Sequence, residues 1–228
     1  VPLDHRISAG RWPWTSRVDA AGVRDAVTSV RMSPTARRRR TAPAGHPARR
    51  PLRVLNEDAL RLRFASALKA GDGVAAAHCV HEWWMRGAFP GFVEDALQKL
   101  WDRAADSVPD WMPMRYVDWL PLAYEVAGRF TADGRGRSNL YLVLLDYSDS
   151  RAEPYGIYVG ASRYKAAERF DQHKAGIRAA GSVLKRGLEV LTGPVQHLQS
   201  IPRAEAARIE EQLAEALRDA GLFVKGGH

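Results

Sequence analysis

The chain has 228 residues, of which 46% are hydrophobic and 26% charged, so it can bury one large core or two small ones. No apolar stretch approaches the roughly 18 residues that suggest a membrane-spanning helix, so no membrane partner is expected. The single cysteine, Cys79, excludes an internal disulfide and suits a reducing, cytoplasmic location.

Positive charge is concentrated at the N-terminus. Residues 1–53 hold twelve arginines against three aspartates, so the net charge of +8 leaves the rest of the chain at −1. With abundant Ala and Pro, no sustained periodicity and the run Arg37-Arg38-Arg39-Arg40, this segment is predicted to be a disordered basic arm. Such an arm can bind phosphates without sequence preference. The alternatives are a solvated tail, or a native start near Met32.

Residues 54–130 are predicted to form a small helical domain. Asn56 is a candidate N-cap, and Gly71-Asp72-Gly73 would end the helix that starts there. Further helices are expected over residues 74–86, from Pro90 onward and from Pro113 onward.

Aromatic residues are concentrated in this helical region, which holds five of the seven tryptophans: Trp83, Trp84, Trp101, Trp111 and Trp119. They are expected to form the core of the domain, with an exposed surface for a protein partner as the alternative. His78 and His81 share a helix face, but two histidines without further ligands are a weak metal site. We therefore expect them to be partly buried and hydrogen-bonded.

Residues 131–138 are predicted to be a linker, because glycine and charge replace apolar periodicity there, and residues 139–228 a separate module. The apolar run from Leu140 to Leu145 predicts a buried strand. The run from Tyr155 to Gly160 predicts a second strand that returns as a hairpin. A helix is expected from Tyr164 to His173.

The rest of the module is predicted to contain more helix and one more strand. Residues 175–186 have helical composition, residues 188–201 have strand-like patches, and a last helix starts at about Arg203. The expected fold class is α/β (α+β), with a small mixed or antiparallel three-stranded sheet flanked by helices.

One constellation in this module resembles a known family. A strand with Tyr141, a hairpin return that ends in Tyr158-Val159-Gly160, and a helix with Arg169-x-x-x-His173 are similar to the GIY-YIG endonuclease domain. The resemblance covers about residues 138–228. It implies metal-dependent hydrolysis of DNA phosphodiester bonds, with Mg²⁺ or Mn²⁺ as cofactor.

The resemblance also implies roles for individual residues. Tyr141 and Tyr158 match the tyrosines that position or deprotonate the attacking water. Arg169 matches the arginine that binds the scissile phosphate. His173 matches a histidine that hydrogen-bonds the first tyrosine and can take its proton. Glu210 matches the glutamate that holds the metal ion.

Three departures from the family pattern bear on activity. Asn139-Leu140-Tyr141 keeps only the tyrosine of the first motif, and the hairpin is longer than usual. Residues 222–228 contain no counterpart of the asparagine that the family has after its last helix. His228 could substitute, the position could be lost, or the chain could be truncated. In the last helix, Glu211 adjoins Glu210, so a shift of one residue would exchange them.

A basic patch is expected beside this site. Residues 163–186 carry a net charge of +5, and six of the basic residues are candidates for nucleic-acid binding: Arg163, Lys165, Lys174, Arg178, Lys185 and Arg186. Such a distribution suits contact with a duplex backbone.

The sequence therefore predicts a DNA endonuclease. A catalytically silent nucleic-acid-binding or scaffold protein is the first alternative, because of the degenerate first motif and the missing asparagine. A nuclease toxin that binds an immunity partner through the Trp-rich helical region is the second.

Overall fold

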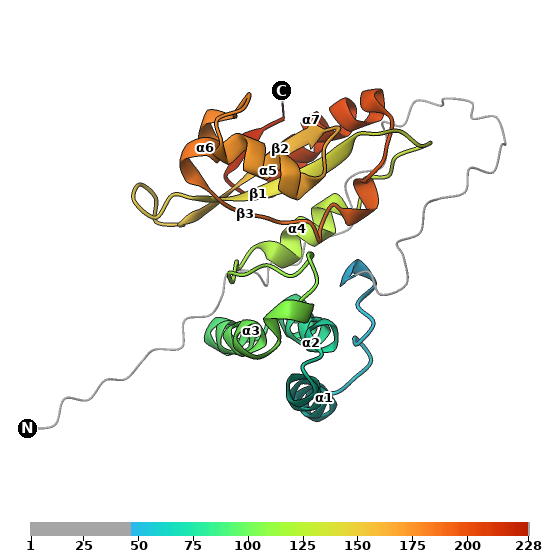
Figure 1. Cartoon of the computed structure of the whole chain (residues 1–228), viewed down its shortest axis with the longest axis vertical. Helices are drawn as coiled ribbons and strands as arrows, with labels where there is room; N and C mark the ends of the chain where they lie inside the picture. The colour runs from blue at the N-terminus through green and yellow to red at the C-terminus, as the bar shows by residue number, and fades with distance from the viewer. Residues whose placement is uncertain (1–46, 228) are drawn as a thin grey trace, which may run out of the picture. The chain divides into compact units, whose positions relative to one another are not determined.

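A computed structural model describes residues 47–227. The predicted first helix is present as α1 (Glu57–Ala70). The Asn56 side chain caps it by accepting a hydrogen bond of 2.9 Å from the Ala59 amide, and Gly71 ends it with φ 68°, a conformation that favours glycine. In Figure 1, α1 is seen nearly end-on beside the two helices that follow, α2 (Gly73–Met85) and α3 (Pro90–Ala104).

The fourth helix is shorter than expected. Pro113 does not open it; α4 (Leu120–Ala127) begins seven residues later, with Pro121 in its first turn, where a missing N–H removes no helical hydrogen bond. Residues 47–227 also contain three short 3-10 helices: η1 (Pro47–Arg49), η2 (Ala105–Ser107) and η3 (Gln196–Leu198).

The sheet has four strands rather than the predicted three. The predicted hairpin is present as β1 (Asn139–Asp146) and β2 (Tyr155–Ser162), paired antiparallel over their full lengths. Two short strands flank it, β3 (Gly187–Val190) antiparallel to β1 and β4 (Val224–Gly226) parallel to β2, so the order is β3-β1-β2-β4. Three residues, one of them a glycine, give β4 too weak a pattern to be recognised in the sequence.

The helices after the hairpin partly match the prediction. They are α5 (Ala166–Lys174), α6 (Gly181–Arg186) and α7 (Arg203–Asp219), labelled in Figure 1. Half of the expected helix over residues 175–186 is present, as α6. Residues 175–180 form a loop, in which Gly176 and Arg178 have positive φ angles. Of the strand-like residues 188–201, only 188–190 belong to a strand, β3.

The two faces of β1 pack against different helices. Leu140, Leu142 and Leu144 join a large apolar core that includes Ile209 and Leu213 of α7. The alternate residues, including Tyr141 and Val143, form a smaller cluster with α5 and α6. The sheet thus separates an apolar core from a face that carries both tyrosines.

The helical region and the sheet pack together across the predicted domain boundaries. Residues 47–227 fall within one compact unit, and α1–α4 share the large core with the sheet. The predicted linker pairs with the segment before α7, through hydrogen bonds of 3.0 Å from the Gly136 amide to Ser200 and from the Ser138 amide to Ile201. Arg50, which belongs to the predicted arm, forms an ion pair with buried Glu82 of α2. The rest of the predicted arm lies outside the described residues.

Trp83, Trp84 and Trp111 are buried, so these three do not form an exposed partner surface. Within residues 47–227, no helix combines the length and apolarity that crossing a bilayer requires.

Candidate active site

Strand register brings the two predicted tyrosines together. Tyr141 lies opposite Gly160 and Val143 lies opposite Tyr158, so both tyrosine side chains project from one face, with ring centroids 6.0 Å apart. Gly160 sits beneath them: a Cβ atom there would lie 2.5 Å from Cζ of Tyr141 and 2.7 Å from the ring of Tyr158. The glycine of the Tyr-Val-Gly motif is therefore required by the packing of the two rings.

Helix α5 adds the predicted histidine and arginine. His173 is buried, and its Nε2 atom lies 3.0 Å from the Tyr141 hydroxyl oxygen. Its Nδ1 atom accepts a hydrogen bond of 2.9 Å from the Ala180 amide. The His173 ring centroid is 5.9 Å from that of Tyr158, so it contacts both tyrosines.

Arg169, one helical turn before His173, is held by the loop that follows α5. Its Nη1 donates to the Ile177 carbonyl and to the Gln172 side chain, both at 3.1 Å, and its Nη2 donates to the Arg178 carbonyl at 2.8 Å. Arg169 also hydrogen-bonds the Tyr141 side chain, which lowers the pKa of this tyrosine. A guanidinium has five N–H donors, so these contacts do not exhaust its capacity to donate to a phosphate oxygen.

Glu210 approaches this cluster from α7, which packs on the opposite face of the sheet. β4 ends opposite Val159, so the edge of β2 beyond it is not covered by β4. There the half-buried Glu210 carboxylate accepts a hydrogen bond from the Ala161 backbone. Its negative charge raises the pKa of Tyr158. Glu211 is exposed. The geometry therefore favours Glu210 over its neighbour.

The site favours uncharged forms. Burial, and secondarily Arg169, lowers the pKa of His173 to about 4, so the ring is neutral at physiological pH. Burial also raises the pKa of Tyr141, of Tyr158 and of Glu210. Arg169 acts in the opposite direction on both tyrosines, since a positive charge stabilises tyrosinate.

Two residues of the predicted basic patch serve the fold. Lys174 donates to the Leu184 and Gly187 carbonyls, and Arg186 forms an ion pair of 2.7 Å with Asp149. The other four do not share this role. Arg163 stacks over the neighbouring Tyr164 ring at 4.9 Å, and no intramolecular partner within residues 47–227 is found for the side chains of Lys165, Arg178 and Lys185.

Two glycines occupy the segment in which the resemblance implies an asparagine. Gly226 and Gly227 have φ angles of 83° and 76°, and a Cβ atom on either would collide with β2 or α7. No side chain fits at these positions, and His228 lies outside the described residues. This part of the family pattern has no counterpart in residues 222–227.

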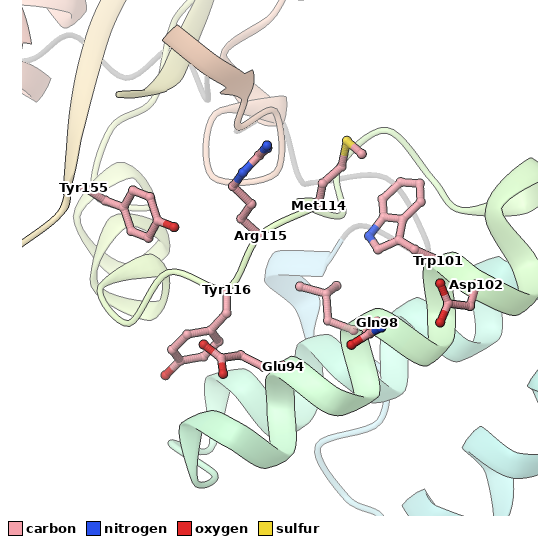
Figure 2. A pocket seen from close by; sticks show the side chains of 9 residues that line it. Glu94, Gln98, Trp101, Asp102, Met114, Arg115, Tyr116 and Tyr155 are labelled. Carbon is pink, nitrogen blue, oxygen red and sulfur yellow. The ribbon is translucent and has the colours of Figure 1, made fainter. Parts of the chain in front are cut away.

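Two hollows among the described residues lie elsewhere. One, of about 360 Å³, is lined by Glu94, Trp101 and Asp102 of α3, by Arg115 and by Tyr155 (Figure 2). The other, of about 730 Å³, lies beside α4. None of the five predicted catalytic residues lines either hollow.

The residues present fit a magnesium ion better than a caged metal. No group of three or more His, Cys, Asp or Glu side chains within residues 47–227 is arranged to hold an ion. His78 and His81 pack against Trp111 instead, with ring centroids 4.9 and 5.7 Å away. Mg²⁺ keeps several waters and needs only one or two carboxylates, which Glu210 can supply.

The chain matches no protein-family model, and no curated protein or solved structure shows significant similarity to it. Sequence reasoning missed the groups that hold the site in place, namely the Ala161 and Ala180 amides and the Ile177 and Arg178 carbonyls. These are backbone groups, which every residue type offers, so no sequence signal could have identified them.

Proposed function

We propose that this protein is a metal-dependent endonuclease that hydrolyses DNA phosphodiester bonds. The supporting observation is the convergence of Tyr141, Tyr158, His173 and Arg169 on one sheet face, with Glu210 at the uncovered edge of β2. The four residues on that face come from three separate elements, so their meeting requires the tertiary fold. Their types are those that phosphodiester cleavage needs.

Each residue has a chemical role in this proposal. Glu210 would hold Mg²⁺ or Mn²⁺, which when bound polarises the phosphate. Arg169, which also hydrogen-bonds Tyr141, would donate to the phosphate oxygens and stabilise the charge that develops on them. Tyr141 and Tyr158 position the attacking water through their hydroxyl groups. Lys165, Arg178 and Lys185, on or next to α5 and α6, would contact the DNA backbone.

A silent DNA-binding protein is the second candidate. It is favoured by the glycine pair at residues 226 and 227, which replaces the asparagine that the resemblance implies. In this case the basic residues would bind DNA, while the tyrosine cluster would be a remnant that packs the sheet face.

One experiment separates the two candidates. The full chain is incubated with supercoiled plasmid, branched DNA and single-stranded DNA, with and without Mg²⁺ or Mn²⁺. Metal-dependent cleavage of any of these three DNA substrates supports the nuclease. Binding in a mobility shift, without cleavage in either metal, supports the silent protein.

The matched control uses the adjacent glutamates. Glu210→Gln removes the carboxylate charge but keeps its shape, so it should abolish cleavage while leaving DNA affinity unchanged. Glu211→Gln should cleave normally, because its side chain is exposed. Loss of cleavage in Glu211→Gln alone would show that the wrong glutamate has been assigned.

A further inference from the structure

We propose that His173 is a fixed hydrogen-bond donor to Tyr141, and therefore positions this tyrosine instead of accepting its proton. The inference rests on the proposed function only for its kinetic consequence. The tautomer itself is a property of the folded protein and can be measured without any cleavage.

The first step concerns the Ala180 amide. A backbone N–H can only donate, and it lies 2.9 Å from Nδ1 of His173, so Nδ1 must be the acceptor in this contact. A neutral imidazole has one acceptor and one donor nitrogen. The proton of the neutral ring is therefore on Nε2.

The second step concerns Tyr141. Nε2 lies 3.0 Å from its hydroxyl oxygen, so the Nε2–H donates and the oxygen accepts. Because Nε2 already carries its proton, it has no lone pair to receive another. For His173 to take the phenolic proton, the Ala180 hydrogen bond would have to break and the ring would have to reverse its tautomer.

The surroundings keep this arrangement in place. His173 is 1% exposed, and the ring contacts Tyr141 and Tyr158, with Arg169 as the charged neighbour. Its pKa of about 4 agrees with a neutral ring. Beyond burial, the interaction between the tyrosines raises the pKa of Tyr141 and lowers that of Tyr158, as expected when Tyr141 donates to Tyr158.

The consequence is a hydrogen-bond chain of fixed polarity. It starts at the Ala180 amide, passes through His173 to the Tyr141 oxygen, and leaves the Tyr141 O–H directed away from the histidine. The loop of residues 175–180, which also holds Arg169, thus determines which way the hydroxyl of Tyr141 donates.

The direct test is ¹⁵N NMR of histidine-labelled full-length protein at neutral pH, without metal or DNA. We expect His173 to be the neutral Nε2–H tautomer, identified by the signals that disappear in His173→Gln. A Nδ1–H tautomer or a charged ring would overturn the proposal, whether or not the protein cleaves DNA.

The kinetic test compares two variants in single-turnover cleavage. In His173→Gln the side-chain amide can still donate to Tyr141 but cannot take a proton, whereas in His173→Asn the shorter side chain can face Ala180 but not reach Tyr141. We expect Gln to stay within about tenfold of wild type and Asn to fall roughly tenfold further, the size of one net hydrogen bond. If His173 were a general base, both would lose about a hundred- to ten-thousandfold. Equal, severe losses in both variants, with wild-type circular dichroism, would overturn the proposal.

Discussion

Two buried or half-buried glutamates in different regions of the molecule show how the same side chain is adapted to opposite tasks. Glu82 of α2 is 1% exposed on its side chain and contacts two arginines, with ion pairs of 2.6 Å to Arg50 and 2.7 Å to Arg86. Burial alone would raise its pKa, but the hydrogen bonds from both arginines outweigh burial and lower the pKa. Its charge is fully compensated inside the fold.

Glu210 of α7 has only the Ala161 backbone to offset its burial, so its pKa is raised. No ion pair within residues 47–227 involves Glu210. A glutamate whose charge is neutralised by arginines stabilises the fold, whereas one left without a cation can bind one from solution.

The largest effect is expected for Glu82→Gln. The substitution leaves two arginines facing a neutral amide in a buried position, and breaking such a pair costs about 3–5 kcal/mol of unfolding free energy. Urea denaturation measures it. The matched control is Glu125→Gln, whose ion pair with Arg129 is exposed and should matter by less than about 1 kcal/mol. Equal losses in the two variants would contradict the structural role of Glu82.

Arg169→Lys should reduce the rate of cleavage about a hundred- to a thousandfold, equivalent to about 2.7–4 kcal/mol, and nearly as much as Arg169→Ala. Lysine keeps the charge but cannot bond two backbone carbonyls and present two parallel donors at once. Single-turnover cleavage and equilibrium DNA binding are measured together, and binding should change far less. Arg61→Lys is the control, since Arg61 lies on the surface of α1, in an exposed ion pair with Glu57. Near-normal cleavage by Arg169→Lys would remove this residue from the site.

Gly160→Ala should reduce cleavage more than it reduces the stability of the fold. The added methyl group must displace the rings of Tyr141 and Tyr158, and overpacking of this kind costs about 1–3 kcal/mol of stability. Cleavage should fall by a larger factor than stability predicts, because both hydroxyls move. Gly181→Ala is the control, since nothing lies within 4 Å of a Cβ atom there. Full activity in Gly160→Ala would show that the tyrosine positions are not critical.

The smallest effect concerns pH and metal. Because the folded state raises the pKa of Glu210, the folded protein binds the proton more tightly than the unfolded chain, and stability falls as pH rises through that window. Without metal, Glu210→Gln should therefore be slightly more stable than wild type at pH 7, by less than about 1 kcal/mol for a half-exposed group. The two should be equally stable at about pH 4, near the ordinary glutamate pKa, where wild-type Glu210 is protonated.

Magnesium should reverse this order at pH 7, because a cation that binds only the folded state stabilises it. The midpoint of urea unfolding should rise with Mg²⁺ in wild type and in Glu211→Gln, but not in Glu210→Gln. A rise of the same size in all three would place the ion elsewhere. Glu82 should show the opposite dependence of stability on pH. Because the folded state lowers its pKa, the stability that Glu82 contributes is lost as pH falls.

Local sequence determined much of the framework. The Asn56 cap and Gly71 set both ends of α1, and the apolar run after Asn139 gave the central strand. Alternation along β1 placed Tyr141 opposite the leucine face, and the four-residue spacing placed Arg169 and His173 on one face of α5. These features depend on residues a few positions apart, so composition and periodicity suffice to predict them.

Tertiary structure alone decided how the site is assembled. The register that sets Tyr141 opposite Gly160, the end of β4 opposite Val159 that lets Glu210 reach Ala161, and the Ala180 amide that fixes the His173 proton all depend on contacts between distant segments. The continuous core of the helices and the sheet, and the pairing of Arg50 with Glu82, were likewise beyond local patterns. Backbone hydrogen bonds and long-range packing carry no residue-type signature, and for this reason the family resemblance indicated which side chains to expect together but not how they are held.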